Sequence, residues 1–138
     1  MVQYDQIKKR GDRMRQIRNT PQREIVRQAM HENYSHPTAE EIYEQIHLKH
    51  PNISFATVYR NLNLLAQQGE IFRLHMPEGP DHYDYTTSPH YHFLCRKCNR
   101  IVDAEIPFEE NFDHYCPPGC KTESHILTLI GLCPECQK

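Results

Sequence analysis

The 138-residue sequence lacks any apolar run of the roughly 18–20 residues that a membrane-spanning helix needs. It also lacks the apolar core of a secretory signal peptide, because the segment 1–18 is polar and basic. No internal repeat or low-complexity tract is present. These absences argue against a membrane-spanning or secreted protein, and we expect a cytoplasmic one with no membrane partner. In a reducing cytoplasm, cysteines more often serve metal or redox chemistry than disulfides.

A large charge of either sign is also missing, since 16 Lys and Arg face 18 Asp and Glu for a net charge of -2. The total hides an uneven distribution along the chain. Residues 1–30 carry eight basic and three acidic side chains, a net of +5, whereas residues 31–80 and 81–138 carry -3 and -4. A basic front end is typical of a protein that meets a polyanion, although a solvated helix face would look the same.

The front of the chain contains no cysteine and carries helix signals instead. Thr20 followed by Pro21 predicts a helix start, because a capping hydroxyl precedes a proline at the first helical position. The capping box Thr38–Glu41 predicts a second start. After a break at 51–54, apolar residues at helical spacing predict a third helix over 55–68.

The second and third predicted helices, joined by a short turn, have the layout of a helix-turn-helix that reads the major groove of DNA. Tyr59, Arg60 and Asn61 lie on the faces of the third helix that the apolar positions leave free. The following segments 70–76 and 81–86 are typical of a two-stranded wing. Many helical hairpins share this layout, so the pattern alone does not establish DNA binding.

DNA contacts are assigned by residue type. Base contacts are expected from Tyr59 and Arg60, and Asn61 is a further DNA-binding candidate, because Arg and Asn pair with guanine and adenine edges. Phosphate contacts are expected from Arg18, Gln22 and Arg23, which belong to the basic front end.

The back of the chain holds all six cysteines, and four of them form two Cys-x-x-Cys pairs. Four thiolates on one tetrahedral ion, with no open position, are typical of structural zinc. The candidate ligands are Cys95, Cys98, Cys133 and Cys136. Two redox pairs or free core thiols are the alternatives. Cys116 and Cys120 flank a Pro-Pro-Gly turn, and we interpret them as loop thiols, with a third metal or a reversible disulfide as the alternatives.

Nitrogen and oxygen ligands form a second group next to the first cysteine pair. His90 and His92 are two positions apart, so on a strand both imidazoles project from one face. Asp84 and Asp103 can complete a site with them. Such a site is harder and more labile than four thiolates, and it suits Fe(II), Mn(II) or Zn(II) bound reversibly. A single histidine would more often be an ordinary surface or core residue.

These residues together resemble the ferric-uptake-regulator (Fur) family of metal-dependent bacterial repressors, over nearly the whole chain. The motifs that carry the resemblance are Arg18–Arg23, His36–Tyr43, Ala56–Leu62, His90–Cys95 with Cys98, and Cys133 with Cys136. The family implies an α+β protein, with a winged helix-turn-helix DNA-binding domain over 1–82 and an α/β dimerisation domain over 83–138. It also implies a homodimer on a double-stranded DNA operator, zinc on the four cysteines, and neither enzymatic activity nor a small-molecule substrate.

By the same resemblance, a regulatory ion is expected at the join of the two domains. Its implied ligands are His36, Asp84, His90, His92 and Asp103. Binding would tie the domains into one orientation and shift the population toward DNA binding. Because the chain has aspartate at position 103, it is similar to the peroxide-sensing (PerR) branch of the family. In that branch Fe(II) reacts with hydrogen peroxide and a ligand histidine is oxidised. The counterparts of that histidine here are His36 and His90. Mn(II) supports DNA binding in that branch with little of this chemistry.

Other functions stay open under this resemblance. Iron-sensing members usually have Glu at the fifth ligand position but share Arg after the recognition-helix tyrosine, so an iron-availability repressor is the alternative. Some of these regulators carry a further metal site. Pro89 and Tyr91 stand where two of its ligands would be, so we do not expect it here. A non-heme metal enzyme and a zinc-stapled interaction module are more remote alternatives.

Overall fold

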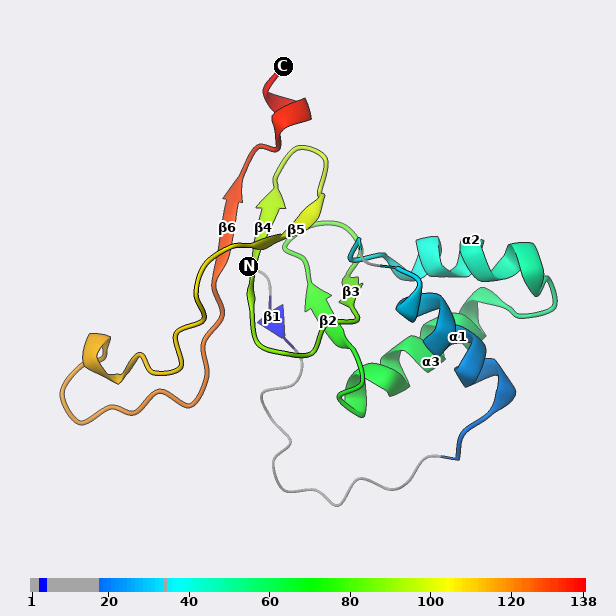
Figure 1. The fold of residues 1–138 in the computed structure, drawn as a ribbon, viewed down its shortest axis with the longest axis horizontal. Coiled ribbons are helices and arrows are strands. Elements are labelled where there is room, and N and C mark those ends of the chain that lie inside the picture. Colours follow the sequence, from blue (N-terminus) through cyan, green and yellow to red (C-terminus); the bar gives the residue numbers. More distant parts are fainter. Residues whose placement is uncertain (1–2, 5–17, 34) are drawn as a thin grey trace. The chain divides into compact units, whose positions relative to one another are not determined.

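The computed structural model describes residues 3–4, 18–33 and 35–138, and the chain divides into two compact units, residues 1–87 and 88–138. The described α-helices lie in the first unit, and a separate sheet forms the second (Figure 1). The predicted α+β class is therefore confirmed. Among the described residues, no helix has the length and apolarity that crossing a bilayer requires.

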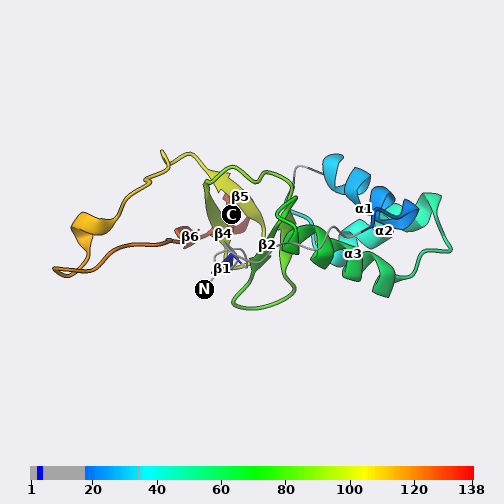
Figure 2. The same ribbon diagram turned by 90° about the horizontal axis from the view of Figure 1, so that it is seen from below.

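The described part of the first unit contains three helices and a small antiparallel sheet (Figures 1 and 2). The helices are α1 (Pro21–His31), α2 (Ala39–Lys49) and α3 (Phe55–Gln67). The strands are β1 (Gln3–Tyr4), β2 (Phe72–His75) and β3 (His82–Asp84), in the order β1–β2–β3. Helices α2 and α3 followed by the β2–β3 hairpin make the winged helix-turn-helix arrangement.

Each of these helices begins at a hydroxyl cap. The hydrogen bonds, each 3.2 Å long, run from the N–H groups of Arg23, Glu41 and Thr57 to the side-chain oxygens of Thr20, Thr38 and Ser54. Each hydroxyl satisfies an amide that has no partner within its own helix. The predicted helix starts at Thr20 and Thr38 are therefore confirmed, and the reason is local chemistry.

The apolar faces of the helices meet in one core. Val26 of α1, Ile42 of α2 and Leu62 of α3 are fully buried. Leu62 shares its face of α3 with Val58 and Leu65, which are also fully buried. This packing holds α3 by its apolar face and leaves Tyr59 and Arg60 exposed.

The second unit is a sheet with two 3-10 turns among its described residues. Its strands are β4 (Tyr91–Cys95), β5 (Ile101–Ala104) and β6 (Thr128–Gly131), in the order β5–β4–β6. Strand β4 pairs antiparallel with β5 and parallel with β6. Parallel pairing needs a long crossover. The chain accordingly leaves the sheet after β5 in an excursion that carries η1 (Asp113–Tyr115), as Figures 1 and 2 show. Turn η2 (Pro134–Gln137) follows β6.

Few apolar side chains are buried in the second unit. The described ones are Tyr91, Leu94, Cys95, Ile101 and Cys133. Two of these are cysteines, and Val102 and Leu129 on the outer strands are exposed. A core this small does not stabilise a unit of this size by itself, so a metal ion or a partner surface is needed.

Candidate metal centres and DNA-binding surface

Four cysteine sulfurs of the second unit converge at one end of its sheet. Cys95 ends β4, and the parallel pairing of β4 with β6 places it opposite Gly131, shortly before the second cysteine pair. The Sγ atoms of all four lie within 4.8 Å of one another, and those of Cys98 and Cys133 are 3.8 Å apart. Zinc–sulfur bonds of about 2.3 Å in a tetrahedron put sulfurs about 3.8 Å apart. The predicted set of Cys95, Cys98, Cys133 and Cys136 therefore fits a structural zinc ion.

Hydrogen bonds within the cluster prepare it for a cation. The N–H of Cys133 donates to Cys95 Sγ at 3.4 Å, and this is the strongest of several backbone hydrogen bonds that lower the pKa of the Cys95 thiol to about 6. A hydrogen bond with the Cys133 side chain, together with burial, raises the pKa of the Cys136 thiol to about 12. Thiolates this close repel one another, so all four ionise together only when a cation compensates their charge.

Two imidazoles and a carboxylate of the second unit face one another on β4 and β5. The strand register pairs His92 with Asp103, and His90 directly precedes β4. Asp103 Oδ1 lies 3.2 Å from His90 Nε2 and 3.6 Å from His92 Nε2. His90 Nδ1–H donates to the carbonyl oxygen of Ser88 at 2.7 Å. This bond selects the tautomer whose Nε2 carries no hydrogen, which is the form that binds metals.

A histidine and a carboxylate are also paired inside the first unit. His36 Nε2 lies 3.2 Å from Asp84 Oδ2, and both side chains are buried. Asp84 ends β3, and its other oxygen, Oδ1, accepts a hydrogen bond from Thr86 N–H at 2.9 Å. A buried carboxylate is costly unless it is paired, hydrogen-bonded or bound to metal. The pairing with His36 is one such compensation.

The donors in the two units are of one chemical kind. Imidazole nitrogens and carboxylate oxygens suit Fe(II), Mn(II) and Zn(II), and metal bonds of about 2.1 Å place neighbouring ligand atoms about 3.0–3.4 Å apart. The 3.2 Å separations of His36 from Asp84 and of His90 from Asp103 agree with that spacing. The described donors in these two groups number two in the first unit and three in the second, fewer than the four to six that these ions take.

The polar face of α3 carries the expected base contacts unequally. Tyr59 and Arg60 are exposed, but Asn61 is buried. Asn61 Oδ1 accepts a hydrogen bond from Arg23 Nε at 3.3 Å, and its Nδ2 donates to Thr57 O at 2.9 Å. Because Arg23 is buried as well, this bond ties α1 to α3 inside the unit. Asn61 and Arg23 thus support the surface on which Tyr59 and Arg60 are displayed.

Arg73 of β2 links the wing to α3, and sequence reasoning missed it. Its guanidinium donates to Asp81 and Asn63 at 2.8 Å and to Tyr59 Oη at 3.1 Å. Asn63 Oδ1 also accepts a hydrogen bond from Tyr83 Oη at 2.9 Å. This network fixes the orientation of Tyr59. No local pattern signals it, because the partners of Arg73 lie eight to fourteen positions away.

The remaining expected contacts are placed in different ways. Arg18 and Gln22 are exposed. Basic residues of the front segment that lie outside the described residues are Lys8, Lys9, Arg10, Arg13 and Arg15.

The two loop cysteines lie apart from the four-cysteine cluster. Cys116 Sγ contacts Thr122 Oγ1 at 3.3 Å, and Cys120 is exposed. Among the described residues, neither belongs to a cluster of three or more metal ligands.

Comparison with known proteins agrees with this arrangement. The sequence pattern of the ferric uptake regulator family matches residues 14–130. The peroxide operon regulator of Bacillus subtilis is 36% identical over 124 residues, which cover 88% of this chain and 86% of that protein. The peroxide-responsive repressor PerR of Staphylococcus epidermidis is 34% identical, covering 88% and 83%. The Helicobacter pylori ferric uptake regulator Fur, with three functional metal binding sites, superposes with a TM-score of 0.76 at 30% identity, covering 88% and 83%.

The chain belongs to the ferric uptake regulator family. It is accordingly a metal-dependent transcriptional regulator in a family of DNA-binding proteins. Members of this family are not enzymes, which removes the non-heme enzyme from the alternatives.

Proposed function

We propose that this regulator is a peroxide-sensing repressor, which binds operator DNA when Fe(II) or Mn(II) is present and releases it when a ligand histidine is oxidised. The observation that carries the proposal is the set of nitrogen and oxygen donors closed by an aspartate, Asp103, beside His90 and His92. The similarity to the peroxide regulators of Bacillus subtilis and Staphylococcus epidermidis supports it.

The regulatory ligands in this proposal are His36, Asp84, His90, His92 and Asp103. Among the described residues, neither the pair of His36 and Asp84 nor the group of His90, His92 and Asp103 completes a coordination shell by itself, so a single ion would need donors from both. Such an ion binds more tightly to the arrangement in which the units are held together, and it shifts the population toward that state. By linkage, DNA that prefers the same state tightens metal binding by an equal factor.

Oxidation reverses this coupling by removing a ligand. When bound, Fe(II) supplies the electrons that activate hydrogen peroxide, whereas Mn(II) does so poorly. One oxygen atom of the peroxide is inserted into a carbon–hydrogen bond of the imidazole of His36 or His90, and the other leaves as water. The oxygenated ring is a poorer ligand, so the ion is lost and the two units are no longer held for DNA binding.

The four-cysteine cluster has a separate role in this proposal. Zn(II) bound to it is structural and permanent, because four thiolates close the tetrahedron and leave no open position. It joins the end of β4 to the segment after β6 and so compensates for the small core of the second unit. Peroxide sensing therefore resides in the nitrogen and oxygen donors and not in these thiols.

Operator DNA is contacted by the first unit. We assign base contacts to Tyr59 and Arg60, which are exposed on α3, and phosphate contacts to Arg18 and Gln22. The buried pair of Asn61 and Arg23 holds α3 in place instead of reaching the DNA. A homodimer would present two recognition helices to half-sites about 34–36 Å apart or a multiple of that distance.

Operator binding with each metal tests this function. The zinc-loaded protein is supplied with Fe(II) or Mn(II), and DNA affinity is measured before and after stoichiometric hydrogen peroxide. We expect the Fe(II) form to lose its DNA and the peptide containing His36 or His90 to gain one oxygen atom by mass spectrometry. The Mn(II) form is the control and should keep both its DNA and its mass. An Fe(II) form that retains full affinity and unmodified histidines would refute peroxide sensing.

An iron-availability repressor is the second candidate, and the similarity to the Helicobacter pylori ferric uptake regulator favours it. The same assay separates the two functions. An iron-availability repressor responds to the concentration of free metal and ignores a stoichiometric dose of peroxide.

A further inference from the structure

The backbone of His36 has an unusual conformation. Its φ angle is +54°, in the left-handed region that residues other than glycine seldom adopt. His36 also precedes Pro37, and the proline ring pushes the residue before it toward extended conformations with negative φ. A residue stays in such a conformation only when its surroundings hold it there. The contacts of the His36 peptide therefore matter for where its imidazole points.

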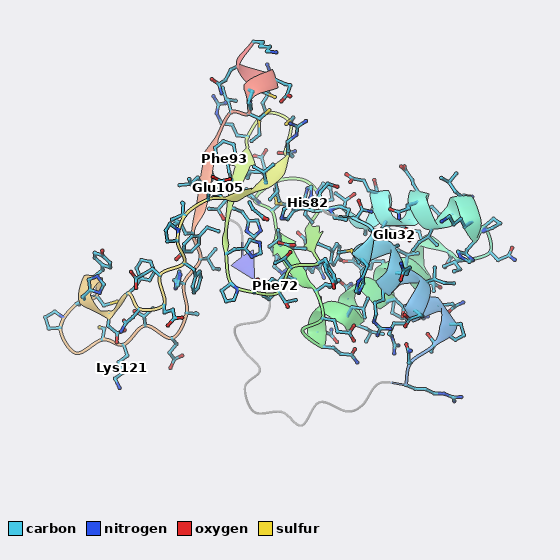
Figure 3. The ribbon with its side chains drawn as sticks, in the orientation of Figure 1. Glu32, Phe72, His82, Phe93, Glu105 and Lys121 are labelled. Carbon is cyan, nitrogen blue, oxygen red and sulfur yellow. The ribbon has the colours of Figure 1, made fainter. Side chains whose placement is uncertain are left out.

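His82 of β3 supplies the side-chain contact to this peptide. Its Nδ1 lies 2.6 Å from the carbonyl oxygen of His36, and because a carbonyl only accepts, Nδ1 carries the hydrogen and donates it. The His82 side chain is buried, and Figure 3 labels this residue. Backbone pairing adds two further contacts, from Tyr83 N–H to Pro37 O at 2.8 Å and between Thr38 and His82.

Strand β3 places this contact and a metal-binding carboxylate on the same side. His82 and Asp84 are two positions apart, so their side chains project from one face of the strand. On that face, His82 holds the carbonyl of His36 while Asp84 Oδ2 lies 3.2 Å from His36 Nε2. Two side chains of a single strand therefore contact His36, His82 at its backbone carbonyl and Asp84 at its imidazole.

We propose that His82 is a positioning residue that holds His36 in its metal-binding conformation. This rests on the proposed function, in which His36 is a ligand of the regulatory ion. Without the hydrogen bond from His82, only the backbone contacts at Pro37 and Thr38 oppose relaxation of the His36 peptide toward the extended conformation that Pro37 favours, and the imidazole turns away from Asp84. The ion must then supply the free energy that restores the strained conformation, so the affinity falls.

Replacing His82 by each of two amide residues distinguishes the effect of the hydrogen bond from the effect of the imidazole ring. In His82→Asn the amide NH₂ lies near the position of the imidazole Nδ1 and still donates to the His36 carbonyl. In His82→Gln the amide NH₂ lies near the position of Nε2 and does not reach it. We expect Gln to weaken Mn(II) binding to the zinc-loaded full-length protein about 10–100-fold, as is common for residues behind a metal ligand, and Asn to rescue it. His47→Asn, at an exposed position of α2, is the matched control and should bind as the wild type does.

Three readouts distinguish positioning from general support of the fold. Co(II) in place of Mn(II) reports the ligand geometry through its visible absorption bands, which should change in His82→Gln and not in His82→Asn. Thermal unfolding without a regulatory ion should differ little between these two variants. In the wild-type protein without that ion, nitrogen NMR should show a hydrogen on His82 Nδ1 that exchanges slowly with water.

Each result has a defined consequence. If the wild type binds Mn(II) but His82→Gln binds it equally tightly, or if His82 Nδ1 carries no hydrogen, His82 does not position His36 and the proposal is overturned while the proposed function stands. If the wild type takes up no ion beyond zinc, the proposed function itself fails, and the positioning role fails with it. The NMR result does not depend on any variant folding.

Discussion

In the first unit, Val26, Ile42 and Leu62 are fully buried between helices, whereas the sheet of the second unit leaves Val102 and Leu129 44% exposed. The first unit follows the ordinary route to stability, in which apolar helix faces are removed from water. The second unit buries few apolar side chains and instead brings four sulfurs together at the end of β4. One unit is therefore held by its core and the other by a cluster that is suited to a metal ion.

The same contrast separates the two kinds of donor. The four thiols belong to one unit and close around a tetrahedral ion by themselves. The nitrogen and oxygen donors are divided, with His36 and Asp84 in the first unit and the others in the second. A permanent ion suits donors that one small fold holds together, whereas the nitrogen and oxygen donors are supplied by two separate folds. Substitutions that act on one unit or one donor set at a time can break this contrast.

The largest effect is expected from Cys133→Ser. Structural zinc contributes about 10–16 kcal/mol in zinc-finger peptides, so loss of one thiolate should release the ion and unfold residues 88–138 while the helices of the first unit persist. Zinc content and limited proteolysis measure both outcomes. Cys120→Ser, at an exposed loop thiol, is the control and should keep its zinc. A Cys133→Ser protein that retains zinc and resists protease would show that the cluster does not stabilise the second unit.

A core substitution in the first unit should act in the opposite way. Leu62→Ala removes a fully buried side chain, and we expect the free energy of unfolding to fall by about 2–5 kcal/mol. Urea denaturation followed by helix content measures this change, and the zinc content should stay the same. Leu48→Ala is the matched control, because that side chain is 87% exposed and its loss should cost under about 0.5 kcal/mol. Equal effects of the two substitutions would argue against the core assigned here.

Ligands from different units should matter equally for the regulatory ion. We expect His36→Ala and His92→Ala each to weaken Mn(II) binding more than about 100-fold, or about 2.7 kcal/mol, without loss of zinc. Paramagnetic resonance of free Mn(II) gives both affinities. His114→Ala, at an exposed position of η1, serves as the control. If only the substitutions in one unit weaken binding, the ion does not take ligands from both.

The smallest effect is expected at an ion pair on the surface of the first unit. Arg27 Nε donates to Glu70 Oε2 at 2.7 Å, and this hydrogen bond lowers the pKa of Glu70. A carboxyl whose pKa is lower in the folded state stabilises the fold above its unfolded pKa, and that stabilisation is lost as the pH falls through the folded pKa.

Glu70→Gln should therefore destabilise the first unit at neutral pH by less than about 1 kcal/mol, because both partners are partly exposed. The difference from the wild type should shrink as the pH falls through the lowered folded-state pKa of Glu70, and it should vanish once the wild-type carboxyl is protonated in the folded state as well. Urea denaturation at neutral and acidic pH gives the comparison. A difference that persists in acid would assign the effect to packing.

Local chemistry explains why much of the fold was predicted correctly. Thr20 and Thr38 cap helices through amides three positions further along the chain, so each signal lies within one turn. The two cysteine pairs are likewise recognisable from their Cys-x-x-Cys spacing. The pairing of His92 with Asp103 agrees with an expectation based on ligand type. The resemblance to a family added His36, which no spacing argument would have joined to the other donors.

Contacts between distant segments explain what the sequence did not reveal. Asn61 has the residue type of a base contact, yet its side chain is buried against Arg23, 38 positions away. Arg73 and His82 carried no local signal, because Arg73 acts on α3 across the wing and His82 reaches a carbonyl 46 positions earlier.

The sequence by itself determined the helix starts, the two cysteine knuckles and the chemical type of each metal donor, because these depend on neighbours within a few residues. Only the tertiary structure decided which polar side chains are displayed and which are buried, and how the strained backbone of His36 is held. The physical reason is that burial and long-range hydrogen bonding depend on how whole elements pack. A residue such as Asn61 or His82 acquires its role only when a distant segment of the chain packs against it.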